Sequence, residues 1–119
     1  MNDSYIEKAK EFFERGKREY EEGLKERDAI KVREGCEKIF HSFVEISNGI
    51  LSEHGIQIPK DHIERSQKLD TLGLGTTYDS VKERLHDTCY YGEIIKPDWL
   101  KHAIDSIREE IERWSNVRC

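Results

Sequence analysis

Residues 84–92 hold the densest set of reactive side chains in the chain. Within this short stretch lie a guanidinium, an imidazole, a carboxylate, a thiol and two phenols. These groups belong to Arg84, His86, Asp87, Cys89, Tyr90 and Tyr91. An imidazole can move a proton to or from a substrate, and a nearby cation can stabilise the charge that develops. We therefore take Arg84 and His86 as candidate catalytic residues and the other four as candidate ligand-binding residues.

Helical geometry limits how this pair can work. Each residue of an α-helix turns about 100°, so Arg84 and His86 should point about 200° apart, while His86 and Tyr90 share a face. The pair can grip one phosphate only if the helix distorts or a second protomer supplies the other half. The alternative interpretation is structural: Leu85 and Cys89 pack inward, and Arg84 makes surface ion pairs.

Hydrophobic residues recur at helical spacing along almost the whole chain, and no segment alternates with period two. The pattern predicts helices over residues 4–26, 28–54, 59–72, 77–91 and 97–114. Short connections favour antiparallel neighbours. We expect an all-α fold, an up-and-down bundle of four main helices plus one short helix, in a single domain over residues 1–119.

Local signals place most helix ends. Ser4 and Glu7 match a capping box at the start of the first helix. Asp28 is a suitable N-cap for the second helix, whose wide apolar stripe predicts the most buried element. Gly55 fits a left-handed cap after that helix, and Gly92 is the expected stop of the fourth.

The third helix is the least regular. Pro59 suits its first turn, and Ile63 with Leu69 or Leu72 would be its core contacts. The glycines at 73 and 75 then break it. They are not a phosphate-binding loop, because no strand precedes them and no lysine-serine or lysine-threonine pair follows.

Composition narrows the class of protein. The 119 residues carry a net charge of −5, and no segment is strongly basic, so a broad groove for duplex nucleic acid is not expected. No signal peptide or long apolar run is present, so we expect a soluble cytoplasmic protein. Abundant Glu, Lys and Arg with only two Gln are typical of thermophile proteins.

The cysteines and histidines give no metal-binding pattern. Three cysteines without close pairing do not form a secreted disulfide framework. We interpret Cys36 as a small core residue, although a disulfide between Cys36 and Cys89 is an alternative. No two histidines lie four apart on one helix beside a carboxylate, although His54 and His62 flank a loop and could approach each other. We expect no metal and no cofactor.

Three stretches carry a family resemblance: residues 30–44, the pair at 54–55 followed by residues 58–62, and Leu85-His86 before a tyrosine-rich helix end. Together they resemble the HEPN proteins, and in particular an archaeal repeat-protein branch of that clan. The resemblance implies a small helical homodimer. Many HEPN proteins are metal-independent ribonucleases, and others are inactive partners of nucleotidyltransferases or bind nucleic acid.

The HEPN ribonuclease motif is an arginine followed, four to six residues later, by a histidine, often read as Arg-Asn-x-x-x-His-Tyr. In this chain Arg84 and Tyr90 match the motif, whereas Leu85 replaces the asparagine and Cys89 the histidine. The resemblance therefore implies a binding or interaction module without hydrolytic activity, which binds a nucleotide, RNA or a partner enzyme. The alternative is a metal-independent ribonuclease that uses Arg84 and His86 at a dimer interface.

Overall fold

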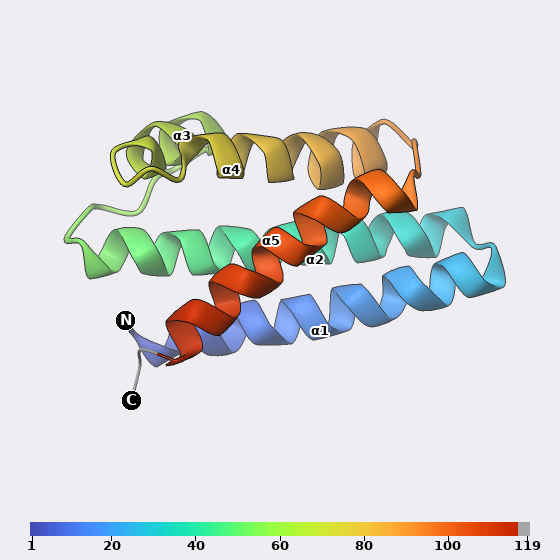
Figure 1. Ribbon diagram of the computed structural model, residues 1–119, viewed down its shortest axis with the longest axis horizontal. Coiled ribbons are helices and arrows are strands. Elements are labelled where there is room, and N and C mark those ends of the chain that lie inside the picture. The colour runs from blue at the N-terminus through green and yellow to red at the C-terminus, as the bar shows by residue number, and fades with distance from the viewer. Residues whose placement is uncertain (117–119) are drawn as a thin grey trace.

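A computed structural model describes residues 1–116 of the chain, which form helices and connecting turns without a strand (Figure 1). The elements are α1 (Asp3–Glu26), α2 (Ala29–Glu53), α3 (His62–Asp70), α4 (Gly75–Val81), the π-helix η1 (Lys82–Tyr91) and α5 (Pro97–Asn116). The predicted all-α class is confirmed.

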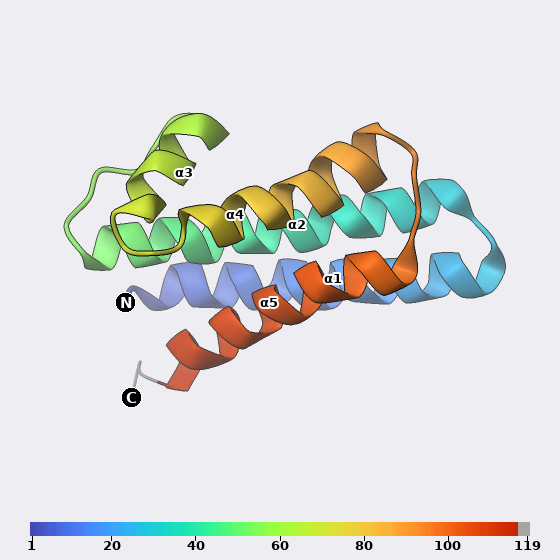
Figure 2. The ribbon, with the colours of Figure 1, turned by 45° about the horizontal axis from the view of Figure 1, so that its top comes forward.

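Helix α2 is the centre of the molecule. It runs antiparallel to α1, and α4 with η1 lies along its other side, while α5 crosses these helices obliquely (Figures 1 and 2). Its buried residues include Cys36, Ile39, Phe40, Phe43 and Ile46. The wide apolar stripe of α2 thus has neighbours on several sides, as predicted.

Glycines let α1 and α2 approach closely. A Cβ atom added to Gly35 would lie 2.5 Å from the backbone nitrogen of Tyr20 and 2.7 Å from the carbonyl oxygen of Gly16. A Cβ atom on Gly16 would lie 2.7 Å from the nitrogen of Ile39. Because backbone atoms cannot move aside as a flexible side chain can, these positions require glycine. The backbones of α1 and α2 are consequently packed directly against each other at these glycines.

Two of the predicted helix caps are confirmed and one is wrong. Asp28 caps α2 by accepting a hydrogen bond from the amide of Lys31 at 3.1 Å, and Gly55 follows the helix with φ of 72°. At the start of α1, however, Asn2 is the N-cap and accepts from the amide of Ser4 at 2.8 Å. Asparagine caps as well as serine does, and capping at residue 2 places Ser4 inside the helix.

Helix α3 begins three residues later than predicted. Asp61 caps it by accepting from the amide of Glu64 at 2.8 Å, so Pro59 precedes the helix. The predicted core contact Ile63 is 73% exposed. The buried residues of α3 are instead Leu69 and the charged Arg65, which is 6% exposed. Arg65 can be buried because hydrogen-bond acceptors surround its guanidinium.

The fourth predicted helix starts at Gly75 and changes character at Lys82. From there to Tyr91 the backbone follows the π pattern, in which each amide bonds the carbonyl five residues earlier. The amide of Gly92 continues this pattern to the carbonyl of Asp87 at 2.8 Å. Gly92 ends the element as predicted, with a right-handed φ of −78°.

Helix α5 begins at Pro97 as predicted, and its inward stripe is the expected one. The buried members are Leu100, Ala103, Ile104, Ile107 and Ile111. Within residues 1–116, no helix combines the length and the apolar character that a membrane span needs.

Candidate functional site

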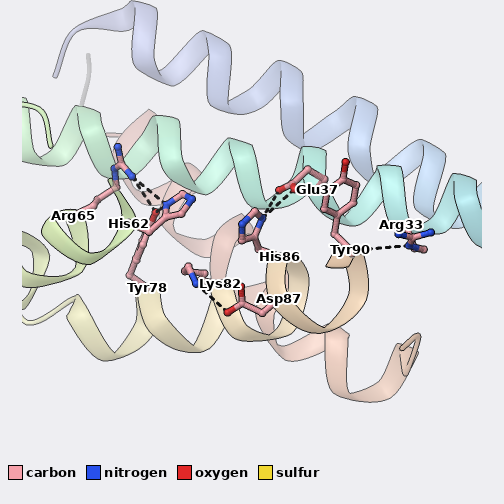
Figure 3. A network of polar contacts seen from close by, with 9 residues as sticks. All are labelled: Arg33, Glu37, His62, Arg65, Tyr78, Lys82, His86, Asp87 and Tyr90. Carbon is pink, nitrogen blue, oxygen red and sulfur yellow. Dashed lines mark hydrogen bonds and ion pairs between the residues drawn. The ribbon is translucent and has the colours of Figure 1, made fainter. Parts of the chain in front are cut away.

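The imidazole of His86 projects from η1 toward α2, where it meets the carboxylate of Glu37. The Nδ1 atom of His86 lies 2.9 Å from Oε1 and 3.0 Å from Oε2 of Glu37 (Figure 3). A carboxylate can only accept hydrogen bonds, so Nδ1 is the donor in both. The neutral ring therefore carries its proton on Nδ1 and has a lone pair at Nε2.

A second imidazole, that of His62 at the start of α3, has the opposite hydrogen-bonding arrangement. Its Nδ1 lies 2.8 Å from the hydroxyl oxygen of Tyr78 and 3.2 Å from Nη1 of Arg65. Guanidinium groups only donate, so Nδ1 of His62 is an acceptor and the proton of the neutral ring is on Nε2. The hydroxyl of Tyr78 accepts from Nη1 of Arg65 at 3.3 Å and can donate its own proton to His62.

Arg65 holds this arrangement in place. Its Nε donates to Oδ1 of Asn48 on α2 at 2.8 Å, and its Nη2 donates to the carbonyl of Pro59 at 3.2 Å. With the contacts of Nη1 to His62 and Tyr78, every nitrogen of the guanidinium has a partner. Arg65 thus joins α3 to α2 and to α4, and its role is to position the site.

The two imidazoles lie beside each other and line one groove, which we call the histidine groove. Their ring centroids are 5.3 Å apart, and both rings contact Phe40, at 5.2 Å for His62 and 4.9 Å for His86. The groove has a volume of about 460 Å³, and Glu37, Lys60 and Asp61 also line it. Its size suits a small ligand or one group of a larger one.

The second nitrogen of each ring is available to a ligand. Neither Nε2 of His62 nor Nε2 of His86 makes a hydrogen bond to residues 1–116. Within residues 1–116 the one fully buried side-chain polar atom without a partner is Oε2 of Glu110, so neither Nε2 atom is fully enclosed by the protein. In Figure 3 these nitrogens lie on the sides of the rings that face each other.

Local charges and burial keep His62 neutral. Burial lowers the pKa of His62 below its ordinary value of 6.5, and the nearby His86, Arg65 and Lys82 lower it further. Burial also raises the pKa of Tyr78, against a smaller opposing effect of the hydrogen bond from Arg65. At neutral pH the pair therefore consists of a neutral imidazole and a protonated phenol.

The π-helix places Tyr90 and Tyr91 next to His86. The ring of His86 lies 4.9 Å from that of Tyr91, five residues later, and 6.4 Å from that of Tyr90. Lys82 and Asp87, also five apart, form an ion pair of 3.0 Å. On an α-helix, residues five apart do not face each other. The π geometry thus brings three of the six candidate residues, His86, Tyr90 and Tyr91, into one cluster.

Arg84 lies apart from this cluster. Its Nη1 donates to the carbonyl of Trp99 at 2.7 Å, and its guanidinium lies 4.8 Å from the centre of the Trp99 ring. It lines a separate groove against α5, together with His102. Within one chain Arg84 and His86 therefore point to different faces, which agrees with the opposite directions predicted for them.

Cys89 is a buried residue of η1 and forms a disulfide with Cys36 of α2, with Cα atoms 6.5 Å apart. This pairing, left open by the sequence, ties η1 to α2 one residue before Glu37. Arg33 on α2 adds a second link, because its Nε donates to the carbonyl of Tyr90 at 2.9 Å. As a buried disulfide partner, Cys89 does not act as a ligand-binding thiol.

Glu37, His62, Arg65 and Tyr78 were not among the candidate site residues. Arg65 lies four residues before Leu69, and this helical spacing could have placed it on the inward face of α3. Residues 1–116 contain no cluster of three or more histidine, cysteine or acidic side chains that could hold a metal ion. Comparison of the chain with protein-family models, curated proteins and solved structures finds no match.

Proposed function

We propose that this protein is a HEPN-like helical binding module without hydrolytic activity, and that it binds a nucleotide or a short piece of RNA in the histidine groove. The main support is a pair of imidazoles that line the groove, with each Nδ1 atom held by protein partners and neither Nε2 atom hydrogen-bonded within residues 1–116. The order of helices around the long central α2 also suits the resemblance to HEPN proteins.

Aromatic rings around His86 support a nucleobase-containing ligand. Tyr91 is 67% exposed beside the ring of His86, and the ring of Tyr90 lies 5.0 Å from that of Tyr91. Exposed aromatic rings provide stacking surfaces for unpaired bases. By the same resemblance we propose a homodimer, and a nucleotidyltransferase as the partner enzyme.

Titration of the protein with mononucleotides and with a short single-stranded RNA, followed by NMR of the histidine ring protons, tests this function. We expect the His86→Ala variant to bind about tenfold more weakly, because a hydrogen bond and a stacking surface are lost. The matched control is His102→Ala, an exposed histidine on α5 outside the histidine groove. Equal affinity of the His86→Ala and His102→Ala variants would contradict the proposed site.

A second candidate is metal-independent RNA cleavage by Arg84 and His86 at a dimer interface. The observation in its favour is the Glu37–His86 pair, because a carboxylate at Nδ1 orients an imidazole to act as a base at Nε2. Arg84 of the same chain lies on a different face from His86, against Trp99, so a second copy would have to supply the arginine.

Mixing two variants distinguishes this candidate from the binding module. If the site is shared between two copies, Arg84→Ala and His86→Ala should each be inactive in the presence of EDTA. Their mixture should regain part of the cleavage, because a heterodimer contains one complete site. A wild-type protein that binds RNA and leaves it intact supports the binding module instead.

A further inference from the structure

The two imidazoles of the histidine groove have complementary hydrogen-bonding roles. Glu37 holds the proton of His86 on Nδ1, so its Nε2 can accept, whereas Arg65 and Tyr78 occupy Nδ1 of His62, so its Nε2 can donate. The rings lie 5.3 Å apart, with an angle of 66° between their planes. One donor and one acceptor therefore lie close together, each fixed by a separate set of protein partners.

The charges around the two imidazoles do not favour a phosphate as the ligand group that they bind. Two carboxylates, those of Glu37 and Asp61, line the groove together with the basic side chains of Lys60 and Arg65, so the acidic and basic groups balance. Four of the five N–H groups of Arg65 are already bonded to the protein, so its guanidinium has little capacity left to bind the oxygens of a phosphate. A neutral polar group suits these surroundings better than an anion.

We propose that the groove recognises the edge of a planar cyclic amide, such as the N–H and C=O pair of uracil, by one hydrogen bond to each imidazole. The ring N–H of the ligand donates to Nε2 of His86, and the adjacent carbonyl accepts from Nε2–H of His62. Phe40 contacts both imidazoles and holds them beside each other. This inference rests on the proposed binding function and names the chemical group that the ligand must present.

Nitrogen-15 NMR of the imidazoles at pH 8, above the ordinary titration range of histidine, tests the two roles without a ligand. We expect the proton of His86 on Nδ1 and that of His62 on Nε2. In the Glu37→Gln variant the amide can donate or accept, so His86 should populate both tautomers, whereas the exposed neighbour control Glu34→Gln should leave it unchanged. The same proton position on both rings of the wild-type protein would overturn the inference.

Binding of uridine and of 3-methyluridine then separates this inference from the proposed function. Methylation removes the N–H that would donate to His86, so 3-methyluridine should bind at least about tenfold more weakly, as expected when a buried acceptor is left unpaired. Equal binding of the two nucleosides would overturn the edge recognition and leave nucleoside binding intact. Failure of both to bind would also overturn this inference, and the titration with mononucleotides and RNA would then decide the proposed function separately.

Discussion

The Nδ1 atom of His86 lies 2.9 Å from Oε1 of Glu37, although 49 positions separate the two residues in the chain. This contact exists because η1 is fixed against α2 by the disulfide of Cys36 and Cys89 and by the hydrogen bond from Arg33 to Tyr90. The geometry of the histidine groove therefore depends on how firmly these two helices are joined.

Removal of the disulfide should destabilise the fold. The bridge joins residues 53 positions apart, so replacing Cys36 and Cys89 with alanine should lower the free energy of unfolding by about 2–4 kcal/mol. Urea unfolding of the variant and the parent measures the difference. In a Cys119→Ser background, thiol titration of the unfolded protein should find no thiol before reduction and two afterwards. Two thiols before reduction would contradict the disulfide.

Alanine at Gly35 should separate α1 from α2. The added Cβ would lie 2.5 Å from the backbone nitrogen of Tyr20, so the helices must move apart, and the variant should lose about 1–3 kcal/mol of stability. The exposed neighbour Glu34 provides the control, since Glu34→Ala should change stability by less than about 0.5 kcal/mol. Urea midpoints that agree for the two variants would show that the close approach is not required.

Replacement of Arg65 should release α3 from the fold. The Arg65→Met variant leaves Oδ1 of Asn48 and the carbonyl of Pro59 without their donor, at a cost of about 1–3 kcal/mol for each buried group that water does not reach. Hydrogen exchange over residues 56–74 should accelerate, while exchange in the α1–α2 hairpin stays slow. The control Lys68→Met changes an exposed position of the same helix. Unaltered exchange in the Arg65 variant would argue against its role as the link.

Acid should destabilise the protein through His62. The pKa of His62 is lowered in the folded state, so below the unfolded value of about 6.5 the unfolded chain binds more protons. Stability should therefore fall as pH drops from about 6.5 to the lowered folded pKa and stop changing below it. The His62→Asn variant keeps an acceptor for Arg65 and should show a smaller fall over this range. Thermal unfolding between pH 5 and 8 measures both proteins, and parallel curves would contradict the assignment.

Glu110 is a site where substitution should stabilise the fold. Its side chain is buried, its Oε2 has no hydrogen-bond partner in residues 1–116, and its Oε1 lies 3.4 Å from Nη1 of Arg113. Because burying an unpaired polar atom costs free energy, Glu110→Met should raise the free energy of unfolding by about 1 kcal/mol. The exposed neighbour Glu109→Met serves as the control in the same urea experiment. A loss of stability would indicate that the carboxylate has a favourable role.

The sequence predicts the helices well because their signals are local. Asp28, Gly55 and Pro97 mark helix ends by short-range chemistry, and the apolar spacing of α2 identifies the most buried helix. The partners in the site are not local. Glu37 reaches His86 only after η1 has packed on α2, and no spacing rule connects residues so far apart in the chain.

Two further features of the site lie outside the helical rules that the prediction uses. The expected turn of about 100° per residue holds for an α-helix, whereas residues 82–91 follow the π pattern, which brings Tyr91 beside His86. Arg65 occupies an inward position on a short polar helix, where the sequence alone does not predict a charged residue. Its burial is explained only by its four hydrogen-bond acceptors, which the structure reveals.

The π pattern of η1 makes the length of this segment as important as its composition. Deleting one residue between 82 and 91 would let the backbone return to the more common α-helical spacing. A deletion that precedes His86 would then turn Tyr91 away from it, because residues five apart share a face only while the π pattern lasts. Related chains that keep this groove should therefore tolerate substitutions along the segment far better than insertions or deletions.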